Sequence, residues 1–191
     1  MNYLVDQYLL YRIRAKRDAD AFGKLYDRYV NSIYRFVYLK LPSKEVAEDV
    51  TSETFLKGWQ YIQRAETIDN VRALFYKIAR HLIADYYRKH ESVEQRTVTF
   101  FPSDTSSYDE GAFSDDQAGR LLMEARADVA LVLERISRLK EGFQDVLTLR
   151  LIDGLGFGDI ATILGKTPGN VRVMFHRALK ALDTLTREED V

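Results

Sequence analysis

Apolar residues recur at intervals of three and four along most of this chain, and that spacing is typical of amphipathic helices. The first long stripe consists of Phe22, Leu25, Tyr29, Ile33 and Phe36. Pro42 then interrupts the pattern, and Ser43 is suited to cap a second helix over residues 44–62. The inward positions of that helix are Val46, Val50, Phe55 and Trp59. Gly58 costs about 1 kcal/mol relative to alanine inside a helix, which weakens the expected last turn.

A third helix is predicted over residues 70–90, after a polar connection at residues 63–70. Its apolar stripe consists of Val71, Leu74, Phe75, Ile78, Leu82 and Tyr86. The helical period is then lost between about residues 91 and 120, where Ser, Asp and Gly dominate as in a flexible linker. Residues 97–101 are suited to a short strand, but no partner strand lies nearby in the sequence.

Helical periodicity resumes near Leu121 and continues toward the C-terminus. We therefore predict an all-α fold of two small helical domains, over residues 1–92 and 123–191, joined by a flexible acidic linker over residues 93–122. A hydrophobic content of 46% is sufficient for packed cores.

The segment from residue 157 to residue 182 has the spacing of a helix-turn-helix. Its short first helix directs Ile160, Ala161 and Leu164 inward, and Gly165 permits the turn. Thr167 is suited to cap the second helix, with Pro168 at its first position. The apolar positions of that second helix are Val171, Met174, Phe175, Ala178, Leu179 and Leu182.

The other face of this last helix is basic, with Arg172, His176, Arg177 and Lys180. A second helix of this kind fits the major groove of DNA, where its first residues approach the base edges. We expect Asn170, Arg172 and Val173 to face bases, and Arg177 and Lys180 to face phosphates. The spacing alone is equally compatible with an ordinary surface helix whose basic face is solvated.

Charge is unevenly distributed along the chain, although the net charge is only -1. Val71–His90 carries five Lys and Arg against one Asp, and Lys166–Arg187 has the same balance. Between them, Glu91–Asp128 carries nine Asp and Glu against three Arg. Two basic segments separated by an acidic one favour binding to an anionic polymer.

The third helix directs a basic face away from its apolar stripe, formed by Lys77, Arg80, His81, Ala84 and Arg88. Tyr61, Tyr76 and Tyr87 lie close by in the sequence. Basic surfaces with aromatic side chains suit single-stranded or melted DNA, because bases stack on the rings. The alternative is a solvated face beside tyrosines that belong to the core.

Several function classes find no support in the sequence. The chain has no cysteine, which excludes disulfides and thiolate chemistry. The N-terminal residues lack the pattern of a signal peptide, and no apolar run reaches the length of a membrane span, so we expect a cytoplasmic protein without direct membrane insertion. No nucleophile has a base beside it and no glycine-rich phosphate loop is present, so we expect no catalytic residue, cofactor or metal site, and no enzyme activity.

The second helix has an acidic face of Glu45, Glu48, Asp49 and Glu53. Paired carboxylates serve metal sites and acid–base chemistry. A solvated face, or a docking surface for a basic partner, is the more frequent explanation.

Four segments occur together and in order: DADAFGKLYDRY, AEDVTSETFLKGW, FYKIARHLIADYYRKH and GFGDIATILGKTPGNVRVMFHRALKAL. Together they resemble the extracytoplasmic-function (ECF, group IV) sigma factors of the sigma-70 family, over both domains. The resemblance implies a region 2-like domain that docks on core RNA polymerase and recognises and melts the minus-ten element. It also implies a region 4-like domain that recognises the minus-thirty-five element.

The resemblance also implies partners and positions. Asp49, Glu53, Phe55 and Leu56 would dock on the clamp helices of the polymerase beta-prime subunit, and the beta flap is the second polymerase contact. The linker resembles a family segment that threads the RNA exit channel. Promoter DNA and an anti-sigma factor complete the expected partners.

For DNA, the connection at residues 62–70 and the helix after it resemble the minus-ten element reader, which captures a base flipped from the non-template strand. The implied minus-ten contacts are Tyr61, Gln63, Asn70, Lys77, Arg80, His81 and Arg88. The implied minus-thirty-five contacts are Thr167, Gly169, Asn170, Arg172, Val173, His176, Arg177 and Lys180. Three positions depart from the usual family residues: Ser52 replaces Gln, His81 replaces Asn, and Met174 replaces an Arg that contacts DNA.

Two other hypotheses stay open. A stand-alone helix-turn-helix regulator would bind duplex DNA without polymerase. A metal-dependent nucleic-acid enzyme would use the acidic helix, and Asp49→Ala would abolish its activity while DNA binding remained.

Overall fold

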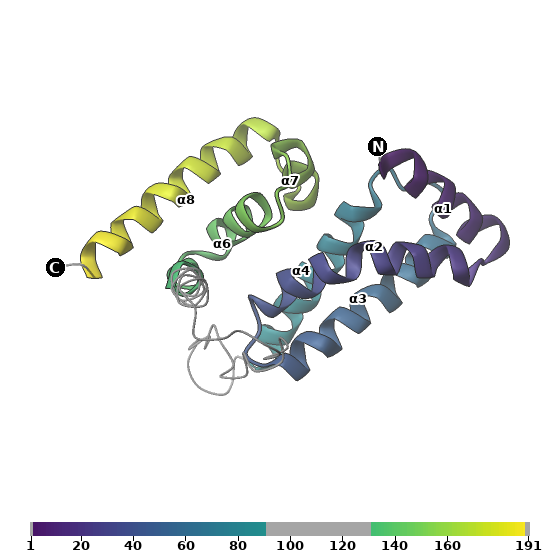
Figure 1. The fold of residues 1–191 in the computed structure, drawn as a ribbon, viewed down its shortest axis with the longest axis horizontal. Helices are drawn as coiled ribbons and strands as arrows, with labels where there is room; N and C mark the ends of the chain where they lie inside the picture. The colour runs from purple at the N-terminus through teal and green to yellow at the C-terminus, as the bar shows by residue number, and fades with distance from the viewer. Residues whose placement is uncertain (1, 91–130, 190–191) are drawn as a thin grey trace, which may run out of the picture.

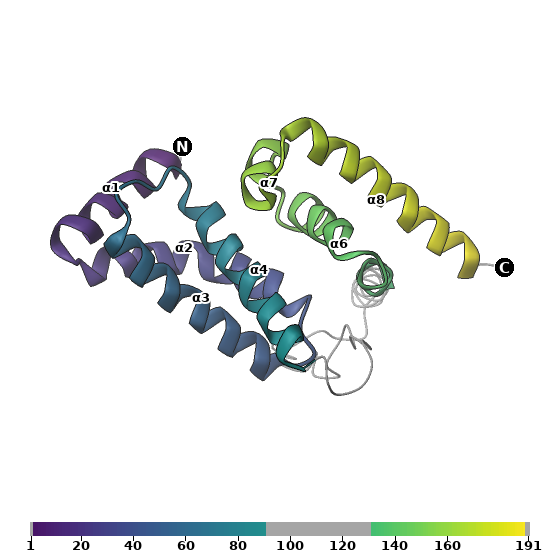
Figure 2. The same ribbon diagram turned by 180° about the vertical axis from the view of Figure 1, so that it is seen from behind.

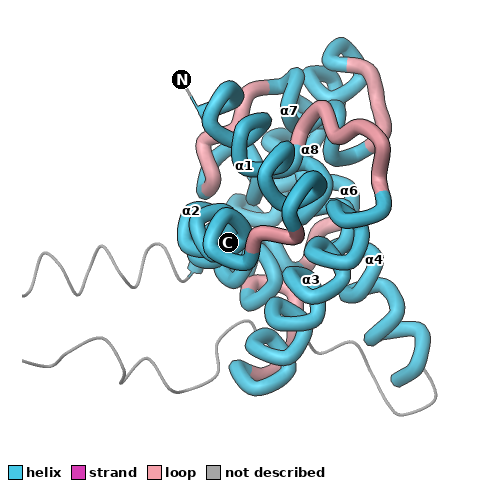
Figure 3. Tube along the Cα trace, turned by 90° about the vertical axis from the view of Figure 1, so that its right-hand side faces the viewer, coloured by secondary structure: helices cyan, strands magenta, loops and turns pink. Residues whose placement is uncertain are grey.

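The computed structural model describes residues 2–90 and 131–189. Within those residues the chain consists of helices and loops, as Figure 3 shows, and it forms two helical groups, which confirms the predicted all-α class. The strand predicted at residues 97–101 and the linker predicted at residues 93–122 lie outside the described residues. None of the helices in the described part is both long and apolar enough to cross a membrane.

The N-terminal domain contains four helices, purple to teal in Figure 1: α1 (Asn2–Lys16), α2 (Ala19–Tyr38), α3 (Lys44–Arg64) and α4 (Val71–His90). Helices α2, α3 and α4 pack against one another, and α1 lies against α2 and α3. The predicted helices over residues 44–62 and 70–90 are therefore confirmed to within two residues.

Side chains cap three of these helices, which explains where they begin. The carboxylate of Asp18 accepts from the Ala21 amide at 3.0 Å, and the Ser43 hydroxyl accepts from the Val46 amide at 3.3 Å. The side-chain oxygen of Asn70 accepts from the Ala73 amide at 2.9 Å. Each cap satisfies an amide that the helix itself leaves unpaired.

Gly58 of α3 lies against the Phe75 ring of α4, and the helix continues past it to Arg64. A Cβ added there would lie 2.5 Å from the Phe75 ring, which also packs on Phe55 and Tyr29. Glycine is required here because the aromatic ring occupies the space of a side chain. The helix predicted over residues 44–62 is therefore confirmed past Gly58, since packing outweighs the low helix propensity of glycine.

Helix α4 is buried on more of its surface than its apolar stripe predicts. Val71, Phe75 and Leu82 are buried as expected, but so are Tyr76 and Ala79, which lie beside that stripe. Helix α4 contacts α7 of the C-terminal domain as well as α2 and α3. The Tyr76 ring packs on Phe36 of α2, and its hydroxyl donates to Asp153 of the C-terminal domain, so both domains contribute to its burial.

The C-terminal domain, green to yellow in Figures 1 and 2, contains α6 (Glu141–Leu147), α7 (Phe157–Leu164) and α8 (Pro168–Glu189). Residues 131–137 are also helical, and α6 continues into a π-helical turn, η1 (Thr148–Ile152). Helix α8 packs on α6 and α7 through Val171 and Ala178, which are fully buried. The predicted apolar face of the last helix is confirmed.

Candidate nucleic-acid interfaces

Helices α7 and α8 form the predicted helix-turn-helix. Gly165 ends α7 in the left-handed conformation, with φ of 63°, which glycine adopts without a steric penalty. The hydroxyl of Thr167 accepts from the Asn170 amide at 3.3 Å, as expected for the cap of α8. All the residues proposed for the minus-thirty-five element are exposed on one side of this unit: Thr167, Gly169, Asn170, Arg172, Val173, His176, Arg177 and Lys180.

Arg172 is positioned by an aromatic ring. Its guanidinium lies 5.4 Å from the centre of the Phe157 ring, and Arg150 lies 4.8 Å from the same ring. Stacking of this kind restrains a long side chain while its head stays in water. Met174, in contrast, is half-buried, and its methyl group lies near Gly142 of α6. Met174 therefore serves the packing of α8.

Helix α4 exposes a basic strip, which comprises Lys77, His81 and Arg88. These residues follow one another at intervals of four and seven, so they lie on one face. Asp85 pairs with both His81, at 3.3 Å, and Arg88, which partly neutralises the end of the strip. Tyr61 is exposed and Gln63 is half-buried on the preceding helix, so the structure leaves both within reach of the loop before α4.

Arg80 is the exception among the basic residues of α4. The sequence groups it with the exposed face, but its Nε donates to the Asp145 carboxylate at 2.9 Å. Asp145 belongs to α6 of the C-terminal domain and is 1% exposed. Arg80 therefore lies at the interface between the domains.

Helix α1 holds the loop before α4 in place. The side-chain amide of Gln7 donates to the carbonyls of Ile68, at 2.9 Å, and Asp69, at 3.3 Å. Arg14 donates to the carbonyl of Glu66. The role of these residues is not recognisable from the sequence, because a donor to a distant main-chain carbonyl leaves no local pattern.

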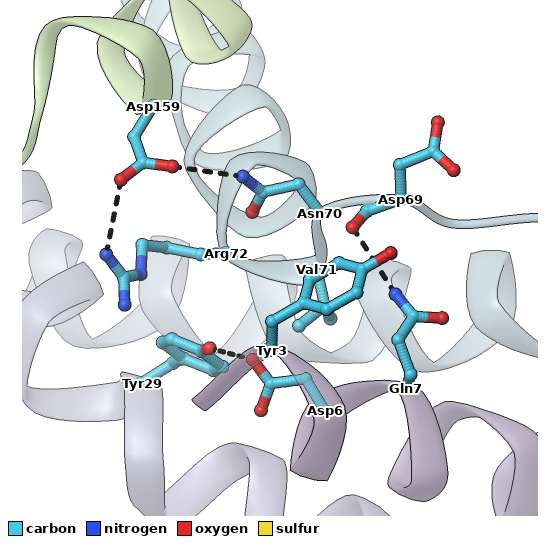
Figure 4. Close-up of a pocket in the computed structure, with 9 residues that line it drawn as sticks. All are labelled: Tyr3, Asp6, Gln7, Tyr29, Asp69, Asn70, Val71, Arg72 and Asp159. Carbon is cyan, nitrogen blue, oxygen red and sulfur yellow. Dashed lines mark hydrogen bonds and ion pairs between the residues drawn. The ribbon is translucent and has the colours of Figure 1, made fainter. Parts of the chain in front are cut away.

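A pocket of about 330 Å³ lies between α1, the start of α4 and α7, as shown in Figure 4. Its lining residues are Tyr3, Asp6, Gln7, Tyr29, Asp69, Asn70, Val71, Arg72 and Asp159. Asp6 accepts hydrogen bonds from Tyr29 and Arg28. Burial and this carboxylate raise the pKa of Tyr29 to about 12, so the phenol is a neutral donor. The pocket thus combines aromatic surface with amide, guanidinium and carboxylate groups.

The acidic face of α3 is exposed, as predicted, at Glu45, Glu48, Asp49 and Glu53. Leu56 beside it is 57% exposed. Phe55 differs: it is 3% exposed and packs on Tyr26 and Phe75. The expectation that Phe55 contacts polymerase directly was therefore wrong. Its ring lies in the core beneath the acidic face of α3 and supports that face by packing. The described residues contain no group of three or more His, Cys, Asp or Glu that could hold a metal ion.

Three aspartates of the C-terminal domain contact polar side chains of the N-terminal domain. Asp145 pairs with Lys40 at 2.8 Å as well as with Arg80. Asp153 and Asp159 contact residues of α2, of α4 and of the loop before α4. We refer to Asp145, Asp153 and Asp159 as the interdomain aspartates.

Asp153 accepts from Arg35 at 2.6 Å and from the Tyr76 hydroxyl at 2.8 Å. Burial raises the pKa of Asp153 above its ordinary value, although Arg35 and Tyr76 act in the opposite direction. Asp159 accepts from the Asn70 side-chain amide at 3.3 Å and lies 3.8 Å from Arg72, as Figure 4 shows.

Comparisons with known proteins find matches to both domains of this chain. Residues 25–93 match the family model Sigma-70 region 2, and residues 130–182 match Sigma-70, region 4. The ECF RNA polymerase sigma-E factor of Salmonella typhimurium is 30% identical over 186 residues, covering 94% of this chain and 93% of that protein. BldN of Streptomyces coelicolor, also an ECF RNA polymerase sigma factor, is 30% identical over 185 residues, covering 90% of this chain but only 62% of BldN.

Among solved structures, CnrH in complex with the cytosolic domain of CnrY has a similar fold, with a TM-score of 0.68 at 21% identity, over 96% of this chain and 98% of that one. The resemblance found in the sequence is confirmed by the family matches, in the same order along the chain. The chain belongs to the ECF sigma factors of the sigma-70 family, which act in transcription initiation by RNA polymerase.

Proposed function

We propose that this protein binds core RNA polymerase and directs it to promoters by contacting DNA at two places. The C-terminal domain contacts the minus-thirty-five element as duplex, and the N-terminal domain contacts the minus-ten element as a melted strand. The observation that carries the proposal is the exposed, capped helix α8, whose eight expected DNA contacts all face solvent on one side.

At the duplex end, the first turn of α8 enters the major groove. Arg172, aligned by Phe157, is suited to donate two hydrogen bonds to a guanine, and Asn170 is suited to an adenine. Arg177 and Lys180 lie farther along the helix and contact phosphates, which fixes orientation without reading sequence.

At the melted end, the pocket beside Asn70 receives a base flipped out of the non-template strand. A pocket of about 330 Å³ is large enough for a nucleobase. Asn70 and Gln7 offer amide groups for the edge of the base, and Tyr3 offers an aromatic surface on which it stacks. The basic strip of α4 then contacts the phosphates of the neighbouring nucleotides in the same strand.

Docking on polymerase uses the exposed residues Asp49, Glu53 and Leu56 of α3. A carboxylate pair beside one large apolar side chain suits a helical partner with basic residues around an apolar groove. On the basis of family membership, the polymerase sites contacted are the clamp helices of the beta-prime subunit and the beta flap. An anti-sigma factor is a further proposed partner.

The experiment combines polymerase binding with promoter mapping. Purified bacterial core RNA polymerase is incubated with wild-type protein, the variant Glu53→Arg/Leu56→Ala, and the control Asp27→Arg on the exposed side of α2. Run-off transcripts from a genomic library are then mapped at their first nucleotides. We expect binding and specific starts for wild type and control, and loss of both for the α3 variant.

Specific binding of the free protein to duplex DNA, with no binding to polymerase, would instead identify a stand-alone helix-turn-helix regulator. That outcome would overturn the proposal.

A further inference from the structure

One residue at the centre of the solvent-facing side of α8 is apolar. Val173 is 50% exposed, and it is the single large hydrophobic residue that α8 exposes within the described residues. Val171 and Ala178, on the opposite face of the helix, are fully buried. Because successive residues are rotated by about 100° around a helix axis, Val173 lies directly opposite the buried face.

The side chains that surround Val173 are polar or basic. Residues three and four positions apart are neighbours on a helix surface, and those of Val173 include Asn170, His176 and Arg177, all of them exposed. Side chains of a helix lean towards its N-terminus, so the isopropyl group extends over Gly169. No atom lies within 4 Å of a Cβ built on Gly169, which leaves that side of Val173 open. Val173 is therefore an apolar spot framed by polar groups.

An isopropyl group recognises few surfaces in a major groove. It neither donates nor accepts a hydrogen bond, so its approach to a polar base edge displaces water without replacing the hydrogen bonds. The C5-methyl group of thymine is the apolar group that base pairs present in that groove. Val173 is also β-branched, which holds its χ1 angle in one preferred rotamer. Contact with a methyl group therefore costs little side-chain freedom.

We infer that Val173 is a specificity-determining residue, and that it contacts the C5-methyl group of a thymine in the minus-thirty-five element. This inference rests on the proposed function, since it takes α8 as the helix that enters the major groove. It adds a base that the hydrogen-bonding residues do not select: Arg172 is suited to guanine and Asn170 to adenine, whereas Val173 favours thymine.

An exposed apolar residue is not by itself a binding residue, because single ones are common on protein surfaces. A Val173 side chain that stays in solvent and one that contacts thymine differ in a single measurable property. Only contact with thymine makes the affinity depend on the C5-methyl group and, at the same time, on Val173.

The first measurement compares thymine with uracil, which lacks only the methyl group. The reconstituted polymerase complex binds a duplex with the mapped promoter, in which each thymine of the minus-thirty-five element is replaced in turn by uracil. Burial of one group of this size is worth about a fourfold change in affinity, so we expect about fourfold weaker binding at one or more positions. For Val173→Ala, the thymine and uracil duplexes should bind equally at one of these positions. Competition in electrophoretic mobility shift measures the ratios.

The second measurement returns the methyl group on a different base. Replacement of the same T·A pair by C·G removes the methyl group and alters the hydrogen-bonding groups, and 5-methylcytosine at that position restores the methyl group alone. We expect the wild-type complex to bind the 5-methylcytosine duplex about fourfold more tightly than the cytosine duplex. The Val173→Ala complex should bind both equally.

Two checks accompany these measurements. Val173→Ala replaces an exposed residue by one of higher helix propensity, so the fold should be retained, which thermal unfolding followed by circular dichroism verifies. Lys180→Ala is the matched control on the same helix, because it removes a proposed phosphate contact. It should weaken binding to all duplexes by the same factor and leave the ratio between thymine and uracil unchanged.

The outcomes separate this inference from the proposed function. Failure of the wild-type protein in polymerase binding or promoter mapping would overturn the proposed function, and this inference with it. If both succeed, the role of Val173 is overturned by a minus-thirty-five element without thymine, by equal wild-type affinity for the thymine and uracil duplexes, or by methyl effects that all persist in Val173→Ala. Loss of one methyl effect in Val173→Ala, with its retention in Lys180→Ala, would support the inference.

Discussion

The helix-turn-helix face of α8 and the strand-binding side of α4 are both expected to contact DNA, but the fold treats them differently. On α8 the polar side chains proposed to contact DNA are exposed, and the Arg172 guanidinium lies over the Phe157 ring. On α4, Arg80 and Tyr76 are bonded to another domain. The comparison teaches that the residues proposed for the duplex are exposed in this structure, whereas part of the side proposed for the melted strand is covered by the C-terminal domain.

The largest expected effect is on promoter binding by the exposed face of α8. Arg172→Ala should reduce binding of the reconstituted polymerase complex to its mapped promoter about 10- to 100-fold, because a bidentate contact to a base is worth about 1–3 kcal/mol. Electrophoretic mobility shift measures the loss.

Two further variants sharpen this prediction. Arg172→Lys keeps the charge but not the planar fork, so it should behave like the alanine variant if Arg172 contacts a base. Arg187→Ala, near the far end of α8, should bind as the wild type does. Full activity of Arg172→Lys would assign the residue to a phosphate instead.

The second effect concerns the packing that supports α4. Gly58→Ala should lower the free energy of unfolding by about 1–3 kcal/mol, because the added methyl group meets the Phe75 ring in a filled core. Gly23→Ala on α2 is the matched control: no atom lies within 4 Å of the added Cβ, so alanine should stabilise that helix by up to about 1 kcal/mol. Urea unfolding followed by circular dichroism compares the two, and equal effects would contradict the role of Phe75.

The third effect concerns the loop between α3 and α4. Gln7→Ala removes donors to the carbonyls of Ile68 and Asp69, each worth about 0.5–1.5 kcal/mol. We expect a several-fold loss of open-complex formation, measured by permanganate reactivity of the minus-ten strand, with unchanged binding to an isolated minus-thirty-five duplex. A loss at both elements would mean that Gln7 supports the fold in general.

The smallest expected effect is a pH dependence of the contact between the two domains. Burial raises the pKa of Asp153 above its ordinary value, and the groups that face it are Arg35 from α2 and Tyr76 and Arg72 from α4. A raised pKa in the form whose domains are in contact means that formation of this contact takes up protons. The population with the domains in contact should therefore grow as the pH falls through the raised pKa, and shrink as the pH rises through it.

Asp153→Asn tests this directly, with spin labels at Lys24→Cys on α2 and Thr184→Cys on α8 that report the distance between the domains. The amide oxygen still accepts from Tyr76, but no charge is buried. The short distance between the domains should therefore persist, and its dependence on pH should vanish. A longer distance between the domains in this variant would contradict the assignment of a net burial cost to the Asp153 carboxylate.

Much of the fold followed from local patterns. The caps at Ser43 and Thr167 and the turn at Gly165 were predicted from residue type and position, because each depends on hydrogen bonds and backbone angles within a few residues. The exposed residues of α8 were predicted for the same reason, since one helix face packs on the domain core and the opposite face cannot.

The errors have a common physical origin in contacts between distant segments. Phe55 was assigned to a docking surface although it packs on Phe75, twenty residues away in the sequence. Gly58 was taken as a weakness of α3 because the ring that fills its space lies on another helix. Arg80 was grouped with exposed neighbours because its partner, Asp145, belongs to the other domain.

The sequence by itself determined the helices, their order, the helix-turn-helix and membership of the sigma factor family, because periodicity, caps and family motifs are encoded within short segments. Only the tertiary structure decided which side chains of α4 are covered, how α1 holds the loop before it, and where the interdomain aspartates lie. Those contacts join residues far apart in the sequence, and their formation depends on which surfaces remain to be buried once each helix has formed.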